Sequence, residues 1–182
     1  MITNYGYTDY DPSAFQARNC IEFPAGPLQM TWQHCSQTAE FLGEFFAVQA
    51  RQRRFNENEA RYNIAYLANE LLENVVKFRT LGGVELESAI DGSNFRMMIS
   101  NWLAAETASR FQDKLSELLA RDPGELLIER IEANAAEPLG TASGLGLLTL
   151  MNDYGARLGW TFRQTAPGEP IHLRSFAALA LV

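Results

Sequence analysis

Hydrophobic and polar residues follow two different periods along the first half of the chain, and each period predicts one type of element. Alternation over residues 20–23 and 28–32 predicts two short strands, joined by a proline-rich turn. From Ser36 or Thr38, either of which suits a helix N-cap, apolar residues recur every three or four positions. A second helical pattern covers residues 59–78 and ends before a pair of glycines. This half therefore predicts a hairpin and two helices.

The middle of the chain repeats this order. Residues 83–90 and 94–100 have the composition of strands, and the Asp91-Gly92 pair between them favours the positive φ angles of a tight hairpin turn. Apolar residues between positions 111 and 119 mark a helix. Asp122-Pro123 predicts the start of another helix, because aspartate suits the N-cap and proline suits the first helical position.

The last third predicts a loop, a helix and a final hairpin. Residues 133–143 are mostly small and indicate a loop, after which Gly144 opens a helix that runs through Tyr154. Residues 157–164 and 171–179 predict two closing strands. Hairpins thus alternate with helices along the chain. This order predicts an α+β two-layer sandwich, with helices on one face of a mixed, mainly antiparallel sheet.

Length and composition predict one domain. The chain has 182 residues, of which 47% are hydrophobic, and no linker divides it. Residues 1–19 indicate an irregular N-terminal arm, and residues 20–182 form the domain. The net charge of −7 argues against direct nucleic-acid binding. Two cysteines without a CxxC motif favour a reducing cytoplasm, and no apolar run reaches the roughly 18 residues of a membrane span.

One polar pair is unusual on the second predicted helix. Glu70 and Asn74 are four residues apart, so both side chains lie on one helix face beside apolar residues. An amide oxygen suits Mg²⁺, a carboxylate can take a proton from a hydroxyl, and Lys77 can reach a phosphate. Exposed charge pairs on a surface helix would have the same spacing, and spacing alone leaves both interpretations open.

A glycine-rich segment supplies the second half of a predicted phosphate site. Residues 143–147, Ser-Gly-Leu-Gly-Leu, lie where a loop meets a helix, so their backbone N–H groups can approach an anion. The helix dipole adds partial positive charge at that end. A G-x-G motif alone suits any tight turn. Together with Glu70 and Asn74 it predicts a phosphate-bearing ligand between two helices.

These two segments resemble a known superfamily. Residues 70–78, ELLENVVKF, closely resemble the N-box of the GHKL superfamily, which includes histidine-kinase catalytic domains, anti-sigma-factor kinases and gyrase. Residues 143–147 resemble its second glycine box. The resemblance covers roughly residues 20 to 180 and implies the superfamily's Bergerat-type α/β sandwich.

The resemblance implies a site for ATP or ADP with Mg²⁺. Glu70 would be the general base and Asn74 the Mg²⁺ ligand. A glutamate at position 70 is typical of anti-sigma-factor kinases, which act on Ser or Thr hydroxyls, whereas histidine kinases generally carry Asn or His there. The candidate nucleotide-binding residues are Asn74, Lys77, Asn101, Trp102, Ser143, Gly144, Leu145 and Gly146.

The chain departs from the superfamily at one box. The first glycine box, D-x-G-x-G, should follow the strand that ends near Ser100, but Asn101-Trp102 stands there and no glycine lies between Asn101 and Pro123. The aspartate of that box recognises the adenine amino group. Asn101 is the candidate replacement, and its carboxamide can present either a donor or an acceptor. Trp102 is the candidate for a pocket wall.

This departure and the closing segment are similar to the SiaB-type protein kinases, and more so to their cyanobacterial-type relatives. The former are single-domain bacterial proteins that phosphorylate a small partner, and the latter are encoded with STAS-like or similar small proteins. We therefore expect a cytoplasmic signalling regulator of the partner-switching type, acting as a Ser/Thr protein kinase on a small partner protein.

Two alternatives remain open from the sequence. Loss of the first glycine box also suits a non-catalytic module, which binds ADP or a dinucleotide with an ADP moiety, such as a flavin or nicotinamide cofactor. Occupancy would then gate partner binding through the different affinities of two conformers. The apolar face of the first helix, with Phe41, Phe45 and Phe46, suits either core packing or a homodimer surface.

Overall fold

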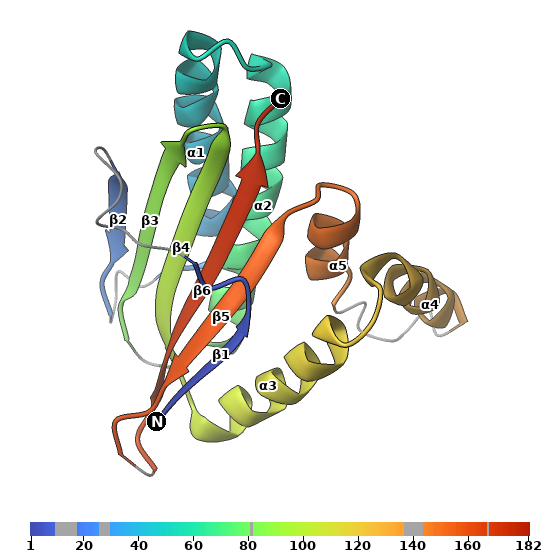
Figure 1. Cartoon of the computed structure of the whole chain (residues 1–182). Helices are drawn as coiled ribbons and strands as arrows, with labels where there is room; N and C mark the ends of the chain where they lie inside the picture. Colours follow the sequence, from blue (N-terminus) through green and yellow to red (C-terminus); the bar gives the residue numbers. More distant parts are fainter. Residues whose placement is uncertain (10–17, 26–29, 81, 137–143, 167) are drawn as a thin grey trace.

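A computed structural model of the chain describes residues 1–9, 18–25, 30–80, 82–136, 144–166 and 168–182. Within this part of the chain, five helices and six strands form an α+β two-layer sandwich (Figure 1). The strands are β1 Ile2–Gly6, β2 Asn19–Phe23, β3 Val84–Asp91, β4 Asn94–Leu103, β5 Arg157–Arg163 and β6 Ile171–Ala180. The helices are α1 Trp32–Gln52, α2 Glu57–Phe78, α3 Ala105–Leu119, α4 Pro123–Ala136 and α5 Leu145–Asn152.

The six strands form one open sheet in the order β1-β5-β6-β4-β3-β2. Every neighbouring pair of the described strands is antiparallel. The predicted fold class is thus confirmed, and the sheet is antiparallel throughout these strands rather than mixed. Short hairpins account for β3–β4 and β5–β6, because antiparallel neighbours need only a tight turn. At the first of these turns Gly92 has a φ of 57°, as the Asp-Gly pair predicts.

The core lies between this sheet and the helices α1 and α2, which run side by side behind it (Figure 1). Alternation along β4 turns Phe95, Met97 and Ile99 toward these helices. Trp160 of β5 and Phe46 of α1 are both 1% exposed. Apolar burial of this kind is the main contribution to folding stability, and it fixes α2 rigidly against the sheet.

The irregular N-terminal arm is a wrong prediction for its first residues. Residues Ile2–Gly6 form β1, which pairs with β5 at the edge of the sheet. Tyr5 packs edge-to-face on Phe162, with ring centroids 5.7 Å apart. The strand is short and its partner lies more than 150 residues away, so local pattern gives little sign of it. Residues 10–17 of the predicted arm lie outside the described residues.

The predicted strand at residues 28–32 is also wrong at its described end, because α1 already begins at Trp32. Residues 28 and 29 lie outside the described residues. Thr31 is the N-cap, in place of Ser36 or Thr38, and its backbone N–H donates to Nδ1 of His34 over 2.9 Å. Five residues of alternation cannot separate a strand from the first turn of an amphipathic helix.

Strand β4 and helix α4 both end later than predicted, and both differences affect the site. Strand β4 continues past Ser100 to Leu103, so Asn101 and Trp102 belong to the strand and point to opposite faces of the sheet. Helix α4 continues to Ala136, into the predicted loop, whose remainder at residues 137–143 lies outside the described residues. None of the described helices is long and apolar enough to cross a membrane.

Asp122 caps α4, the helix that forms one wall of the pocket described below. Its Oδ1 accepts hydrogen bonds from the backbone N–H groups of Gly124 and Glu125, at 2.9 and 3.0 Å. We expect Asp122→Ala to lower the free energy of unfolding by about 1 kcal/mol, because it leaves these N–H groups without a partner. Urea unfolding measures the effect. Asp122→Asn keeps an acceptor and should lose much less, and equal losses in both variants would contradict the cap.

Candidate functional site

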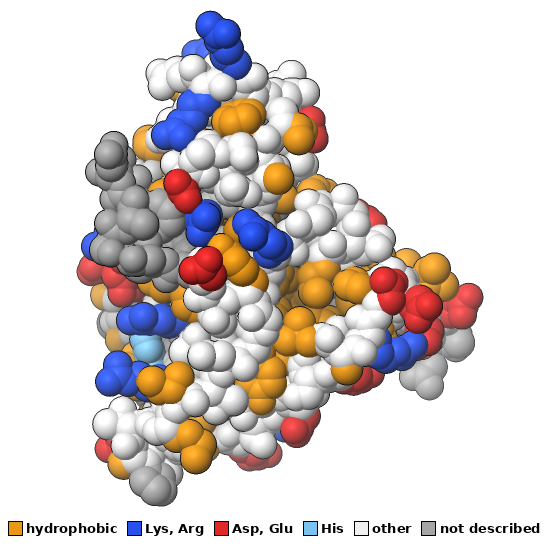
Figure 2. All heavy atoms as spheres, in the orientation of Figure 1, with side chains coloured by type: hydrophobic (Ala, Val, Ile, Leu, Met, Phe, Trp, Pro, Cys, Tyr) orange, Lys and Arg blue, Asp and Glu red, His pale blue; other side chains and the backbone are white. Residues whose placement is uncertain are grey.

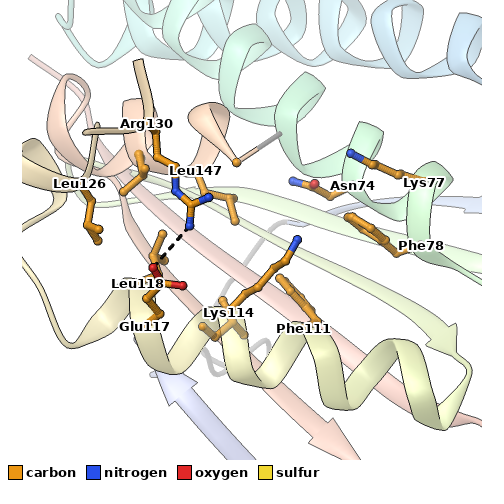
Figure 3. A pocket seen from close by; sticks show the side chains of 13 residues that line it. Asn74, Lys77, Phe78, Phe111, Lys114, Glu117, Leu118, Leu126, Arg130 and Leu147 are labelled. Atoms are coloured by element: carbon orange, nitrogen blue, oxygen red, sulfur yellow. Dashed lines mark hydrogen bonds and ion pairs between the residues drawn. The ribbon is translucent and has the colours of Figure 1, made fainter. Parts of the chain in front are cut away.

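Helix α2 presents its polar residues to a pocket that also touches α3, α4 and α5 (Figure 3). We call this the outer pocket, and Asn74, Lys114, Arg130 and Gly144 are among its lining residues. The Nδ2 of Asn74 donates to the backbone carbonyl of Glu70 over 2.9 Å, as an i,i+4 contact within the helix. This bond orients the carboxamide and leaves Oδ1 as its available acceptor. Lys77, one turn further along, lines the same pocket.

Gly144 and the start of α5 form the opposite rim. Gly144 is the N-cap of α5 and has a φ of +98°, a conformation that favours glycine. Because a glycine cap has no side chain, the N-cap residue itself provides no acceptor for the first N–H groups of α5. Gly144 and Asn74 are seventy residues apart in the sequence, yet both line the outer pocket. Ser143 lies outside the described residues.

Helices α3 and α4 close the outer pocket on its remaining sides. Figure 3 shows Lys114 of α3 extending toward the space between Asn74 and Leu147. Arg130 of α4 forms an ion pair with Glu117 of α3, with 3.4 Å between Nη2 and Oε1. Hydrophobic side chains gather in the hollow between α3, α4 and α5, as Figure 2 shows. The outer pocket therefore combines apolar walls with cationic groups at its edge.

A second, inner pocket lies between the first pocket and the sheet. Asn74, Phe78, Phe111 and Leu147 line both pockets, so the two are neighbours. The inner pocket is almost entirely apolar, and Trp160 of β5 lies on its sheet side. Phe111 packs edge-to-face on Trp160, with ring centroids 6.0 Å apart, and so anchors α3 over the sheet.

Asn101 provides the main polar group of the inner pocket. It is 1% exposed, and neither Oδ1 nor Nδ2 has a hydrogen-bond partner among the described residues. Buried amides in folded proteins are nearly always hydrogen-bonded, so an orphan carboxamide beside a pocket is a strong sign of an absent partner. The structure thus places Asn101, predicted as a ligand contact, at the base of the site.

Glu70 lies against α5, and the walls of the two pockets do not include it. A Cβ atom at Gly146 would stand 1.7 Å from Oε2 of Glu70, so a larger residue at this position of α5 would require the Glu70 carboxylate to move. Burial raises the pKa of the Glu70 carboxyl, and the charge of Glu73 raises it further. Glu70 and Gly146, both predicted as site residues, are therefore in direct contact with each other.

Trp102, the candidate for a pocket wall, lines neither of the two pockets. Because neighbouring residues of a strand alternate, its ring projects from the face of β4 opposite to Asn101, where it contacts His172 at 4.8 Å between ring centroids. It is 38% exposed and lies away from both pockets. Leu145 packs its side chain into a small apolar cluster with Leu126 and Leu148, so only its backbone can serve the site.

Phe111, Lys114 and Arg130 are among the pocket residues that the sequence did not predict. Phe111 and Lys114 are three residues apart and share one face of α3, a weak signal of a common surface. That face becomes part of a pocket only because the fold places α3 across from α2. Nothing in the sequence fixes that placement, because the pattern of α3 predicts only that one side of the helix is apolar.

The arrangement suits an anionic ligand with an apolar end. Lys77 and Lys114 line the outer pocket and form no ion pair with another described residue, so both charges remain available to a phosphate. The free N–H groups of α5 add a second anion-binding feature. Neither a family model nor a curated protein matches this chain.

The raised pKa of Glu70 gives stability a pH dependence with a definite sign. The folded state disfavours the ionised carboxylate, so Glu70 costs stability above its folded pKa and costs nothing once both states are protonated. We expect Glu70→Gln to raise the melting temperature at pH 7.5, with a difference that disappears toward pH 4. Thermal unfolding across this range measures it. The exposed Glu40 provides the control Glu40→Gln, and a Glu70→Gln gain that is independent of pH would contradict the assignment.

The contact between Glu70 and Gly146 predicts strong coupling in a double-mutant cycle. Gly146→Ala places a methyl group where the carboxylate now lies and should destabilise the protein. In a Glu70→Ala background the same substitution should be neutral, or stabilising by up to about 1 kcal/mol through helix propensity. We expect a coupling energy of about 1–2 kcal/mol from urea unfolding. Additive effects would show that the two residues do not touch.

Proposed function

We propose that this protein is a nucleotide-binding signalling regulator of the GHKL type, which binds ATP or ADP with Mg²⁺ and phosphorylates a Ser or Thr hydroxyl of a small protein partner. One observation carries the proposal: Asn74 of α2 and Gly144 at the start of α5 line one pocket, together with Lys77 and Lys114. The N-box and second glycine box resemblances predict this pairing. The STAS-like partner rests on the resemblance alone, and the cytoplasm rests on the resemblance and on the two cysteines.

The donor set fits a nucleotide-bound Mg²⁺. Mg²⁺ in such sites takes one or two protein oxygens and completes its shell with phosphate oxygens and water. Asn74 supplies one such oxygen, since its Nδ2 is engaged with the Glu70 carbonyl. When bound, Mg²⁺ would neutralise charge on the phosphate oxygens. Lys77, Lys114 and the α5 N–H groups would hold the same phosphates from other sides.

In the kinase, Glu70 would accept the proton of the attacking hydroxyl. The hydroxyl oxygen would form a bond to the γ-phosphorus as the bond to the β-phosphate oxygen breaks, and ADP would leave. A carboxylate whose pKa is raised toward neutrality is the better base for this step. The side chain would have to rotate away from Gly146 to reach a hydroxyl in the outer pocket.

One observation favours a second candidate function, a non-catalytic switch. Glu70 contacts the Gly146 backbone and stands outside the pocket walls, as expected of a residue that positions α5. Such a module would bind ADP, or a dinucleotide with an ADP moiety, and occupancy would change the affinity for a partner protein. A ligand with different affinities for two conformers is sufficient for this effect.

Nucleotide binding is tested by thermal shift and calorimetry with ADP, ATP and flavin and nicotinamide dinucleotides, each with Mg²⁺. A ligand at about 100 times its Kd should raise the free energy of unfolding by about 2.7 kcal/mol. Asn74→Ala should remove the Mg²⁺-dependent part of the gain. Asn69→Ala is the matched control, because Asn69 lies on the same helix and donates instead to Glu73 over 2.8 Å. Absence of any shift in the unmodified protein would overturn both candidate functions.

Phosphoryl transfer separates the two candidates. The protein is incubated with labelled ATP, Mg²⁺ and whichever protein the neighbouring gene encodes. Transfer to that protein that is lost in Glu70→Gln, while nucleotide binding persists, supports the kinase. A nucleotide-dependent complex without transfer supports the switch, and it would remove the catalytic role of Glu70.

A further inference from the structure

A third pocket lies between the end of α2 and the start of α3, and we call it the cationic pocket. It has a cavity volume of about 470 Å³. Four basic side chains line it, whereas none of its described lining residues is acidic: Lys77, Arg79, Arg110 and Lys114. Like charges around one hollow repel each other, although the chain as a whole carries a net charge of −7. Such a local concentration of positive charge favours an anion.

The two arginines of the cationic pocket keep donors available. Arg79 follows α2, and its Nη2 donates to the backbone carbonyl of Met30. A guanidinium carries several N–H donors, so this bond holds the group in place without using all of them. Arg110 of α3 pairs with Glu106, at 3.7 Å between Nη2 and Oε1, but the two side chains are 69% and 83% exposed. An ion pair so exposed contributes little, and an anion in the pocket can replace it.

Two further features of the cationic pocket are complementary to an anion. Ala104 and Thr107 line it at the start of α3, a helix of 15 residues. The N-cap, Ala104, provides no side-chain acceptor for the first N–H groups of this helix, where the helix dipole adds partial positive charge. Thr80 also lines the pocket, and its Oγ1 is buried without a hydrogen-bond partner among the described residues. A hydroxyl in this position can donate to an anion.

A purely structural explanation accounts for only part of this arrangement. Basic residues at the C-terminal end of a helix offset its partial negative charge, and this suits Lys77 and Arg79 at the end of α2. It does not apply to Arg110 and Lys114, which belong to the other helix. Nor does it explain the unpartnered hydroxyl of Thr80, since a buried hydroxyl without a hydrogen bond costs stability. A bound anion explains all of these features together.

We propose that the cationic pocket binds a phosphate group, carried by inorganic phosphate or by a small phosphomonoester. Arginine forks and the N–H groups of a helix N-terminus are the donors that proteins use for phosphate. Here they come from two different elements, an arrangement that suits a tetrahedral phosphate better than a planar carboxylate. The cavity of about 470 Å³ is larger than a bare phosphate requires, so it has room for the organic part of a monoester. The pocket would bind this ligand whether or not the outer pocket binds a nucleotide.

An NMR titration of the ¹⁵N-labelled protein with inorganic phosphate or glycerol 3-phosphate tests the proposal. Sodium chloride at the same ionic strength is the reference, because it reproduces general charge screening. Residues 105–107 carry the first N–H groups of α3, and their signals should shift saturably with phosphate but not with chloride. Arg110→Gln should weaken the binding of both ligands by about fivefold or more. Tighter binding of glycerol 3-phosphate would assign the pocket to a monoester, and equal binding would assign it to the phosphate group alone.

A second variant and a matched control locate the phosphate. Thr80→Val keeps the side-chain shape but removes the unpartnered hydroxyl, so it should weaken phosphate binding while the melting temperature of the ligand-free protein does not fall. Arg130→Gln is the control, because Arg130 lines the outer pocket and not the cationic pocket. It should leave the affinity for phosphate unchanged.

Three results would overturn the proposal. The signals of residues 105–107 could shift equally in phosphate and chloride, which would show that no specific site exists. Arg110→Gln could bind phosphate as tightly as the unmodified protein. The saturable shifts could be confined to the N–H groups of α5 and be lost in Arg130→Gln, which would place the phosphate in the outer pocket. None of these results depends on nucleotide binding, so the proposed function is tested separately.

Discussion

The close contact between α2 and the first turn of α5 is the constraint on which the candidate site depends. Gly146 has no side chain, and Oε2 of Glu70 occupies the place that a Cβ atom would take. Tyr66 of α2 stacks on Tyr154 just beyond α5, with ring centroids 4.9 Å apart. The two contacts fix both ends of a short helix on α2. They thereby bring Gly144 and the free N–H groups of α5 to the pocket that Asn74 lines.

The outer and inner parts of the pocket differ in chemistry, because different layers of the fold form them. Its outer part is made by helix ends and long charged side chains, which suit a solvated, anionic ligand group. Its inner part is made by the core face of the sheet, where water is excluded and a hydrogen bond is selective. Phe111 joins the two parts, because it packs on Trp160 and Phe162 while it also lines the outer pocket.

Much of this arrangement was predictable where local chemistry decides the structure. The Asp91-Gly92 turn, the Asp122-Pro123 helix start and the end of α2 at Phe78 all follow from residues that act within one turn. Strand β1 could not be predicted in this way, because its pairing with β5 is a long-range contact. The start of α1 was predicted wrongly, because Thr31 and the residues before it alternate as a strand would.

The site shows the same division between local and long-range information. The sequence alone predicts that Asn74 and Gly144 share a ligand, because each motif has its own local chemistry. It does not place Lys114 or Arg130, whose role depends on how α3 and α4 stand relative to α2. It also misplaces Trp102, because the end of β4 decides which of two neighbouring residues faces the pocket. A shift of one residue along a strand moves a side chain to the opposite face of the sheet.

Both candidate functions depend on where the Glu70 side chain lies. The carboxylate cannot both lie against Gly146 and take a proton in the outer pocket, because neither Glu70 nor Gly146 lines that pocket. A kinase therefore needs a rotation of Glu70 that loosens α5, whereas a switch would use the same rotation as its signal. In either case the half-buried carboxylate starts from a place where burial and the nearby Glu73 already disfavour its charge.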